Sequence, residues 1–197
     1  MFATYKGSNT GAVFDPEGET VAMVLSSAKS TEIYLSDRFG RSPQRLTNNR
    51  SSEVSPTWAP DGRRLAITSD QLGSPQIYLL DKQSGEMSRV RIPERNYCAE
   101  PDWNPVDPDW LVMTVGVGRF FQIAIHNLAT GETRVLTEHQ GDGVEPTWTS
   151  DGRHIVYTVR DAGTKRLQLL DSVTGETAAL HSTRFGEASE ASFVYPY

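Results

Sequence analysis

Three glutamates at equal spacing are the residues of this chain best suited to chemistry. Glu100, Glu145 and Glu190 follow one another at intervals of 45 residues, and each stands three residues before a large aromatic residue. Carboxylates gathered in one place could coordinate Ca²⁺ or bind a basic protein surface. A glutamate at a strand start could equally accept backbone N–H bonds, and regular polar positions in repeats are usually structural. We prefer the structural interpretation and keep the acidic rim as a functional hypothesis.

Signatures of the common catalytic sites are missing. The chain has no Gly-x-Ser-x-Gly elbow, no His-Glu-x-x-His spacing and no glycine-rich phosphate loop. His139 is expected at the surface. Cys98 is the single cysteine, which excludes an internal disulfide and a multi-cysteine zinc site. A metal-dependent (Ca²⁺) hydrolase that uses the repeated carboxylates is the enzymatic alternative that remains, and otherwise no cofactor is expected.

Composition narrows the class of protein further. The 197 residues are 37% hydrophobic and carry a net charge of -6. This balance argues against non-specific nucleic-acid binding, which needs Lys and Arg massed on one face. No apolar run approaches the roughly 18 residues of a membrane span. The first residues lack a basic segment followed by an apolar one, so no signal peptide is expected at this start.

A repeat with a period of about 45 residues positions the glutamates. It is marked by five aromatic anchors spaced 44, 45, 45 and 45 residues apart: Phe14, Trp58, Trp103, Trp148 and Phe193. A repeat of roughly 40 to 50 residues with strand and turn signals is typical of a β-propeller blade, whose sheet must stack on neighbours to bury both faces. The predicted fold is therefore an all-β propeller.

Each repeat unit reads as four short antiparallel strands, so that one unit is one blade. A strand that ends in the anchor is followed by a tight turn, as at Asp61-Gly62 and Asp151-Gly152. The third unit lacks the Asp-Gly pair, and its Trp110 is expected to pack at the blade edge. The blades are predicted at about 9–52, 53–97, 98–142 and 143–187.

The two ends of the chain do not complete a further blade. Residues 188–197 read as the first strand of a fifth unit, and Phe2–Lys6 as the fourth strand of a preceding one. Either these strands close a four-blade ring imperfectly, or the chain is the C-terminal part of a larger propeller. The second interpretation is favoured. It predicts open strand edges and hence self-association.

Aromatic residues suggest two further roles. Phe120 and Phe121 follow Arg119 in a loop expected on the same face as the glutamates. They have the composition of a protein interface, although one ring could instead pack on the sheet. Tyr34, Tyr78 and Tyr157 alternate within strands and are predicted to pack between blades.

Local motifs give the chain a family resemblance along essentially its whole length. Ser55-Pro56-Thr57-Trp58, the stretch Thr68–Gln71 and the terminal Tyr195-Pro196-Tyr197 carry it. With them the chain resembles the β-propeller of the TolB family, periplasmic components of the Tol–Pal system. The resemblance implies a single propeller region over 1–197, corresponding to the last four blades and closing strand of a six-bladed propeller. Blades of this kind also occur in prolyl oligopeptidase-type peptidases, which leaves the propeller portion of such a peptidase as an alternative.

The resemblance further implies a non-enzymatic role in the periplasm. Proteins of this family bind the lipoprotein Pal over one mouth of the propeller channel and help to maintain the outer membrane during cell division. The N-terminal part that contacts TolA has no counterpart in this chain. Carried over by alignment and joined to the repeated glutamates, the expected partner-binding residues are Ser8, Asn9, Thr10, Gly11, Glu53, Val54, Ser55, Glu100, Glu145 and Glu190.

Overall fold

The computed structural model describes residues 9–26, 30–180, 188–189 and 191. The chain divides into two compact units, Met1–Val90 and Arg91–Tyr197, and each is described by itself. Ser8, Glu190 and Phe193 lie outside the described residues, as do the predicted strand Phe2–Lys6 and most of the closing strand at 188–197.

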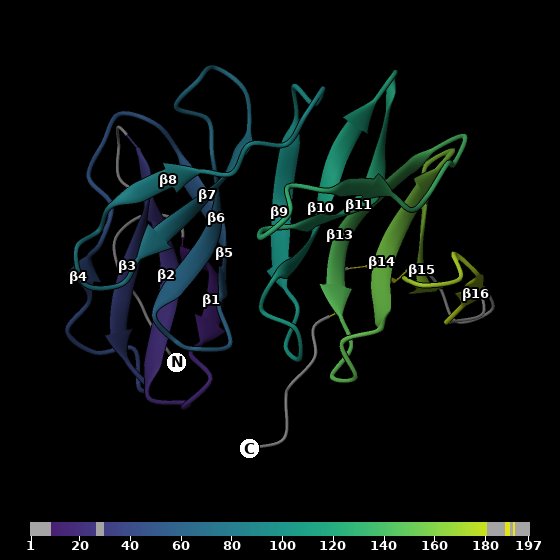
Figure 1. Ribbon diagram of the computed structural model, residues 1–197. Coiled ribbons are helices and arrows are strands. Elements are labelled where there is room, and N and C mark those ends of the chain that lie inside the picture. Colours follow the sequence, from purple (N-terminus) through teal and green to yellow (C-terminus); the bar gives the residue numbers. More distant parts are fainter. Residues whose placement is uncertain (1–8, 27–29, 181–187, 190, 192–197) are drawn as a thin grey trace. The chain divides into compact units, whose positions relative to one another are not determined.

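Each unit contains two four-stranded antiparallel sheets in which neighbours in sequence are neighbours in space (Figure 1). The sheets of the first unit are β1 (Asn9–Phe14), β2 (Thr20–Ser26), β3 (Thr31–Asp37) and β4 (Gln44–Arg45), then β5 (Glu53–Trp58), β6 (Arg64–Ser69), β7 (Gln76–Asp81) and β8 (Met87–Arg89). Those of the second are β9 (Cys98–Trp103), β10 (Trp110–Val117), β11 (Phe120–Asn127) and β12 (Thr133–Val135), then β13 (Asp142–Trp148), β14 (His154–Asp161), β15 (Thr164–Asp171) and β16 (Thr177–Ala179). The predicted fold class of four four-stranded blades is confirmed, and β13 begins at Asp142, one residue before the start predicted for the fourth unit.

Position within the sheet decides how apolar each strand is. The second strands are buried on both faces, as in β6, where only the first residue is not fully buried. They are therefore nearly continuous runs of apolar residues rather than alternating ones. The fourth strands are two or three residues long and mostly exposed. Short, polar edges of this kind limit pairing with other chains.

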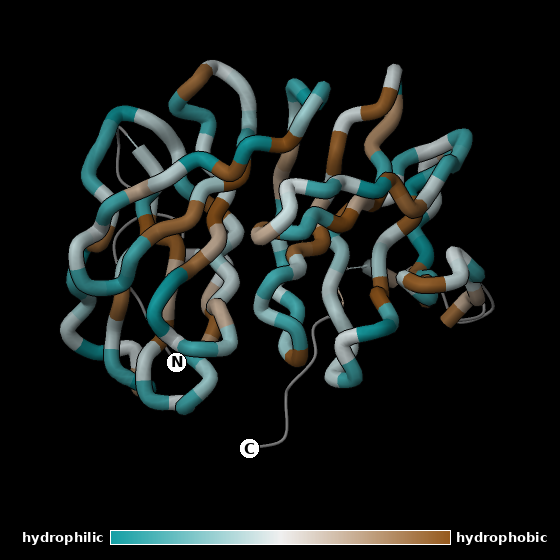
Figure 2. Tube along the Cα trace, in the orientation of Figure 1, coloured by the Kyte–Doolittle hydropathy of each residue, from teal (hydrophilic) through white to brown (hydrophobic). Residues whose placement is uncertain are grey.

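Apolar side chains of the two sheets pack together within each unit. In the first unit, Val24 and Ile33 of one sheet join Trp58 and Tyr78 of the next in one buried cluster. In the second, Ile123 packs with residues of the next sheet in the same way. The hydrophobic stretches of Figure 2 follow these middle strands. Stacking of one sheet on another is thus the source of the core, as a blade repeat requires.

The predicted packing between sheets is found for two of the three tyrosines. Tyr78 and Tyr157 are buried between sheets, as expected. Tyr34 instead packs on the other face of its sheet, against a cluster that includes Met23. Phe14 is 49% exposed, unlike the three tryptophan anchors, which are buried.

In the third sheet an asparagine replaces the missing Asp-Gly turn. Asn104 accepts hydrogen bonds through Oδ1 from the backbone N–H groups of Val106 and Asp107, at 2.9 Å each. Its Nδ2 donates to the carbonyl of Gly152 in the next sheet at 2.7 Å. Trp110, which follows this turn, is half-buried against the core of the second unit, with Arg134 over its ring.

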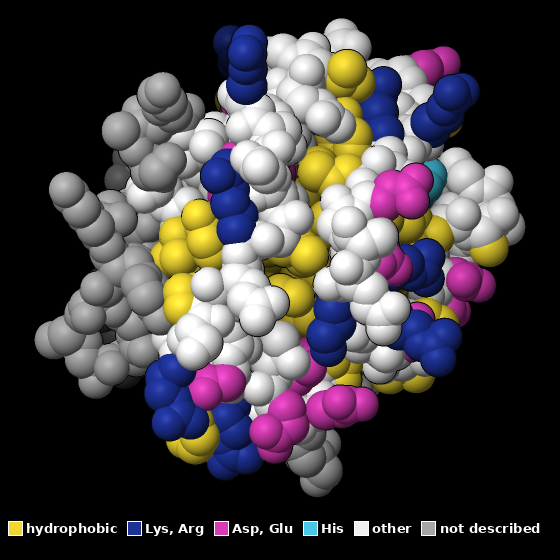
Figure 3. Space-filling view, turned by 90° about the vertical axis from the view of Figure 1, so that its left-hand side faces the viewer, with side chains coloured by type: hydrophobic (Ala, Val, Ile, Leu, Met, Phe, Trp, Pro, Cys, Tyr) yellow, Lys and Arg dark blue, Asp and Glu magenta, His cyan; other side chains and the backbone are white. Residues whose placement is uncertain are grey.

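No helix in the described part of the chain has the length and apolar character that a membrane crossing needs. On the face shown in Figure 3, basic and acidic side chains are interspersed and do not gather by sign.

The contact between Asn104 and Gly152 leads to a stability prediction. Gly152 has φ +66°, and an added Cβ would lie 2.7 Å from Asn104 Oδ1 and 2.8 Å from Val106 Cβ. Gly152→Ala should therefore lower the free energy of unfolding by about 2–4 kcal/mol, because backbone strain and a clash add together. Urea unfolding followed by circular dichroism measures this.

Gly175→Ala is the matched control, since Gly175 has φ +76° but no atom within 4 Å of an added Cβ. Gly175→Ala should lower the free energy of unfolding by about 1 kcal/mol, because it adds backbone strain but no clash. Equal losses in the two variants would contradict the proposed close contact between the sheets.

Candidate protein-binding surface

The repeated position three residues before each anchor is a β-bulge. In every sheet the pairing between the first and second strands shifts register at this place. The residue there has a left-handed backbone conformation, with φ between 52° and 59°, in Gly11, Ser55, Glu100 and Glu145. A bulge re-aims the side chain that it carries, so the bulge determines where the two described glutamates point.

The carboxylate of Glu100 is engaged inside the second unit. Its Oε2 accepts hydrogen bonds from the Thr114 hydroxyl at 2.7 Å and from the backbone N–H of Glu145 at 2.8 Å. Two residues on, Asp102 Oδ2 accepts from the backbone N–H of Trp148 at 2.8 Å. Two acidic side chains of β9 thus bind backbone N–H groups of β13, the first strand of the next sheet. For Glu100 this is the structural role that we preferred from the sequence.

Glu145 has a different partner from Glu100. Its Oε1 forms an ion pair with Arg160 on β14, and its side chain is 18% exposed. Glu145 Oε2 and Arg160 Nε are buried without a hydrogen-bond partner among the described residues. By the repeat, the N–H equivalent to the one that Glu100 binds would belong to Glu190. The acidic rim itself stays a prediction, because it requires all three carboxylates.

The expected partner-binding residues of the first unit differ in accessibility. Thr10 and Gly11 are exposed in β1, and Val54 and Ser55 are half-buried in β5. Glu53 is fully buried, and its Oε1 accepts a hydrogen bond from the Ser69 hydroxyl at 2.8 Å. Burial raises the pKa of Glu53. It could therefore influence a partner only through its neighbours.

The hairpin between β10 and β11 presents the aromatic pair Phe120 and Phe121. The Phe121 ring lies 4.6 Å from the ring of Tyr97, and the Arg119 guanidinium lies 4.7 Å from the centre of the Phe120 ring. Asp142 Oδ1 accepts the backbone N–H of Phe121 at 2.9 Å and so ties the hairpin to β13. The Phe121 ring therefore packs against Tyr97, whereas the Phe120 ring lies beside the Arg119 guanidinium.

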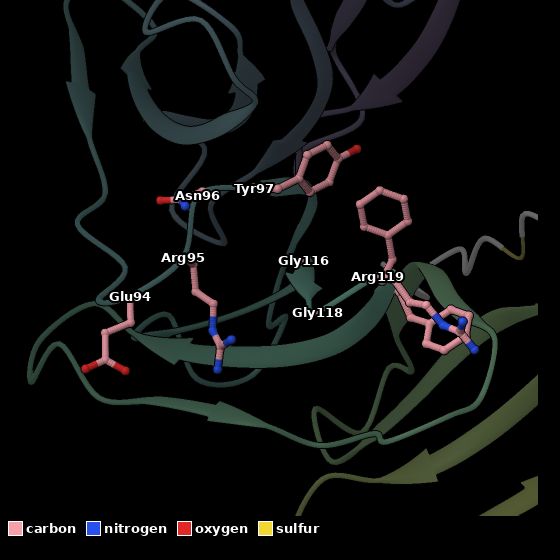
Figure 4. A pocket seen from close by; sticks show the side chains of 9 residues that line it. Glu94, Arg95, Asn96, Tyr97, Gly116, Gly118 and Arg119 are labelled. Carbon is pink, nitrogen blue, oxygen red and sulfur yellow. The ribbon is translucent and has the colours of Figure 1, made fainter.

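Two hollows flank Phe120 within the second unit. We call the first the Arg95 hollow; it has a volume of about 400 Å³ and is lined by 94–97, Gly116 and 118–121 (Figure 4). We call the second the Lys165 hollow; it has a volume of about 510 Å³ and is lined by Phe120, 140–142 and 160–165. A half-buried phenyl ring between two hollows is a surface into which side chains of a partner can fit.

A polar chain supports the loop that leads into β13. His139 Nε2 lies 2.7 Å from the Tyr157 hydroxyl, which donates to Gln168 Oε1 at 2.8 Å. Since that hydroxyl hydrogen is used, the His139 ring donates its own N–H to the tyrosine oxygen. Burial, and then the charge of Arg166, lower the pKa of His139. His139, expected at the surface, is half-buried, and its ring turns to this hydroxyl.

Sequence reasoning found the aromatic pair but not its surroundings. Among the described residues, the places equivalent to Asp142 hold Ser52 and Tyr97, and no ion pair equivalent to that of Arg160 with Glu145 is found. No periodic signal could therefore have revealed this ion pair or the contact of Asp142 with Phe121. Within the described residues, no group of three or more His, Cys, Asp or Glu is placed to hold a metal ion.

Four-stranded antiparallel blades with a shared bulge define the chain as a β-propeller protein. The chain belongs to the TolB β-propeller family, because it matches the family described as "TolB beta propeller domain" over residues 1–194. The predicted family resemblance is thereby confirmed.

Individual relatives agree with this assignment. The Tol-Pal system protein TolB of Bordetella pertussis is 28% identical over 146 residues, which is 73% of this chain and 32% of the relative. The chain thus spans about a third of the length of the curated relatives that it matches. The crystal structure of TolB from Acinetobacter baumannii superposes with a TM-score of 0.77 at 25% identity, over 89% of this chain and 44% of that one.

Enzymes share the fold at lower identity. A puromycin hydrolase structure superposes with a TM-score of 0.69 at 19% identity, over 87% of this chain and 28% of that one. This likeness shows the propeller fold alone.

The structural role of Glu100 can be tested by stability. Glu100→Ala should lower the free energy of unfolding by about 1–2 kcal/mol, because the Thr114 hydroxyl and the Glu145 N–H lose their acceptor. Glu138→Ala, which removes an exposed carboxylate of the same unit, is the control and should change little. If both variants unfold at the same urea concentration as the parent, Glu100 is not a structural acceptor.

The contact of His139 with Tyr157 predicts a pH dependence. Because the pKa of His139 in the folded protein lies below its ordinary value of 6.5, the unfolded chain binds more protons just below that pH. Stability should therefore fall as the pH drops from 7.5 to 5.5, and His139→Gln should reduce this fall. Urea unfolding at both pH values measures it.

The buried His126 and Glu53 also have shifted pKa values, the histidine lowered and the glutamate raised. They are common to the parent and the variant, so the difference between the two proteins isolates His139. An identical loss of stability in both would refute the assignment.

Proposed function

We propose that this chain is the partner-binding propeller of a Tol–Pal system protein. In this role it acts in the periplasm without catalysing a reaction. It binds Pal through the face that carries the loops leading into the first strands, and so supports the outer membrane during cell division. Membership of the TolB β-propeller family over residues 1–194 is the observation that carries the proposal.

The surface around Phe120 supports binding of a protein. Aromatic residues and arginine are enriched in interfaces and dominate their binding energy when they fill pockets. Phe120 lies between two hollows, with Arg119 over its ring, and its hairpin is fixed by the bond from the Phe121 N–H to Asp142. A fixed hairpin lowers the entropic cost of binding, since little of it has to be ordered.

Calorimetric titration of the periplasmic domain of Pal into this chain tests the proposal. Saturable binding is expected. Phe120→Ala should weaken it by at least about tenfold, which corresponds to about 1.4 kcal/mol of lost contact.

Phe39→Ala is the matched control. Phe39 is 56% exposed in the turn after β3, beside Arg38 and Arg41, and so also presents a phenyl ring with cations. This turn lies at the opposite ends of the strands from the loops that lead into the first strands, so its loss should leave Pal binding unchanged. Failure of a folded sample to bind Pal would contradict the proposed function, and an equal effect of both variants would contradict the role of Phe120.

A further inference from the structure

Two arginines line the Arg95 hollow without an acidic partner. Arg95 makes no hydrogen bond or ion pair with another described residue, and the contact of Arg119 is with the Phe120 ring. Glu94 is the acidic residue of the lining, and it is exposed in a left-handed turn with φ +59°. The lining therefore has a net charge of +1, on a chain whose net charge is -6.

The lining of the hollow is partly aromatic, and glycines lie between the two arginines; a Cβ added at Gly116 would lie 3.2 Å from the Tyr97 side chain. Figure 4 shows Arg95 and Arg119 on opposite sides of Gly116 and Gly118. Tyr97 and the two phenylalanines complete the lining. Gly118 has no atom within 4 Å of an added Cβ, so the middle of the hollow is open to an incoming group.

From this arrangement we infer that the Arg95 hollow is a binding site for a carboxylate side chain of a protein partner. The guanidinium groups of Arg95 and Arg119 donate hydrogen bonds to its oxygens, and the aromatic walls contact the apolar residues beside it. The inference rests on the proposed function in one respect, namely that the occupant comes from a protein.

The charge and shape of the hollow select this occupant. Guanidinium groups match the planar carboxylate and bind it through paired N–H donors. A phosphate group carries nearly two negative charges at neutral pH, for which a lining of +1 beside Glu94 compensates poorly. The aromatic rings of the lining favour a carboxylate carried by a peptide over a free anion, because they offer apolar contact beside it.

Nuclear magnetic resonance of the arginine side chains tests the inference directly. The probe is the capped tripeptide acetyl-Leu-Glu-Leu-amide, added to ¹⁵N-labelled protein while the Nε–Hε signals are followed. The signals of Arg95 and Arg119, assigned from Arg95→Gln and Arg119→Gln, should shift saturably. The matched peptide acetyl-Leu-Gln-Leu-amide should bind at least about fivefold more weakly, since its amide is uncharged.

The double variant R95Q/R119Q should lose the response to the glutamate peptide in the amide signals of 94–97 and 116–121. The double variant R63Q/R91Q removes the same charge from two exposed arginines outside the hollow and should keep it. Circular dichroism confirms that each variant is folded.

Three results would overturn the inference: no saturable shift, equal affinity for both peptides, or saturation by inorganic phosphate but not by the glutamate peptide. These results are independent of the Pal titration. A glutamate-specific response without Pal binding would support the carboxylate site and contradict Pal as the partner. Pal binding without that response would support Pal as the partner and contradict the carboxylate site.

Discussion

The structure depends on one backbone constraint, the left-handed residue three positions before each anchor. A residue other than glycine in this conformation costs about 1 kcal/mol or more, yet Ser55, Glu100 and Glu145 all adopt it. In return for this cost, the bulge sets the directions of the neighbouring side chains. The bulge lets the tryptophan that follows turn into the core while the residue at the bulge faces the neighbouring sheet or the loops. Anchor and loop positions are therefore set together, and the proline that follows three of these residues restricts the backbone further.

Hydrophobic packing and polar contacts have different roles in joining neighbouring sheets. The apolar cluster of each unit supplies most of the favourable free energy, because the second strands are buried on both faces. Glu100 and Asp102 accept hydrogen bonds from the next sheet and Asn104 donates one to it; these bonds are directional and fix how the two sheets are aligned. Alignment determines where the hairpin of Phe120 stands relative to Asp142 of β13, and so shapes the Lys165 hollow between them.

The fold could be read from the sequence because its signals are periodic. Tryptophan anchors, Asp-Gly turns and β-branched second strands recur at the same places, so each unit supports the interpretation of the others. The candidate site could be predicted only in part. Phe120 and Phe121 stood out by composition, but the hollows around them depend on Arg95, Asp142 and Lys165, which occur once. The contact of His139 with Tyr157 could not be predicted for the same reason, since the two residues lie 18 positions apart in the sequence and the contact has no repeat to support it.

The two carboxylates of β9 also give the repeat array a direction. Glu100 and Asp102 reach forward to backbone N–H groups of β13, and any blade that follows offers such groups whatever its side chains are. These two contacts therefore depend on the backbone of the following blade and not on its side chains. Removal of the following blade would take these backbone donors away from both carboxylates, whereas Glu100 would keep its hydrogen bond from the Thr114 hydroxyl.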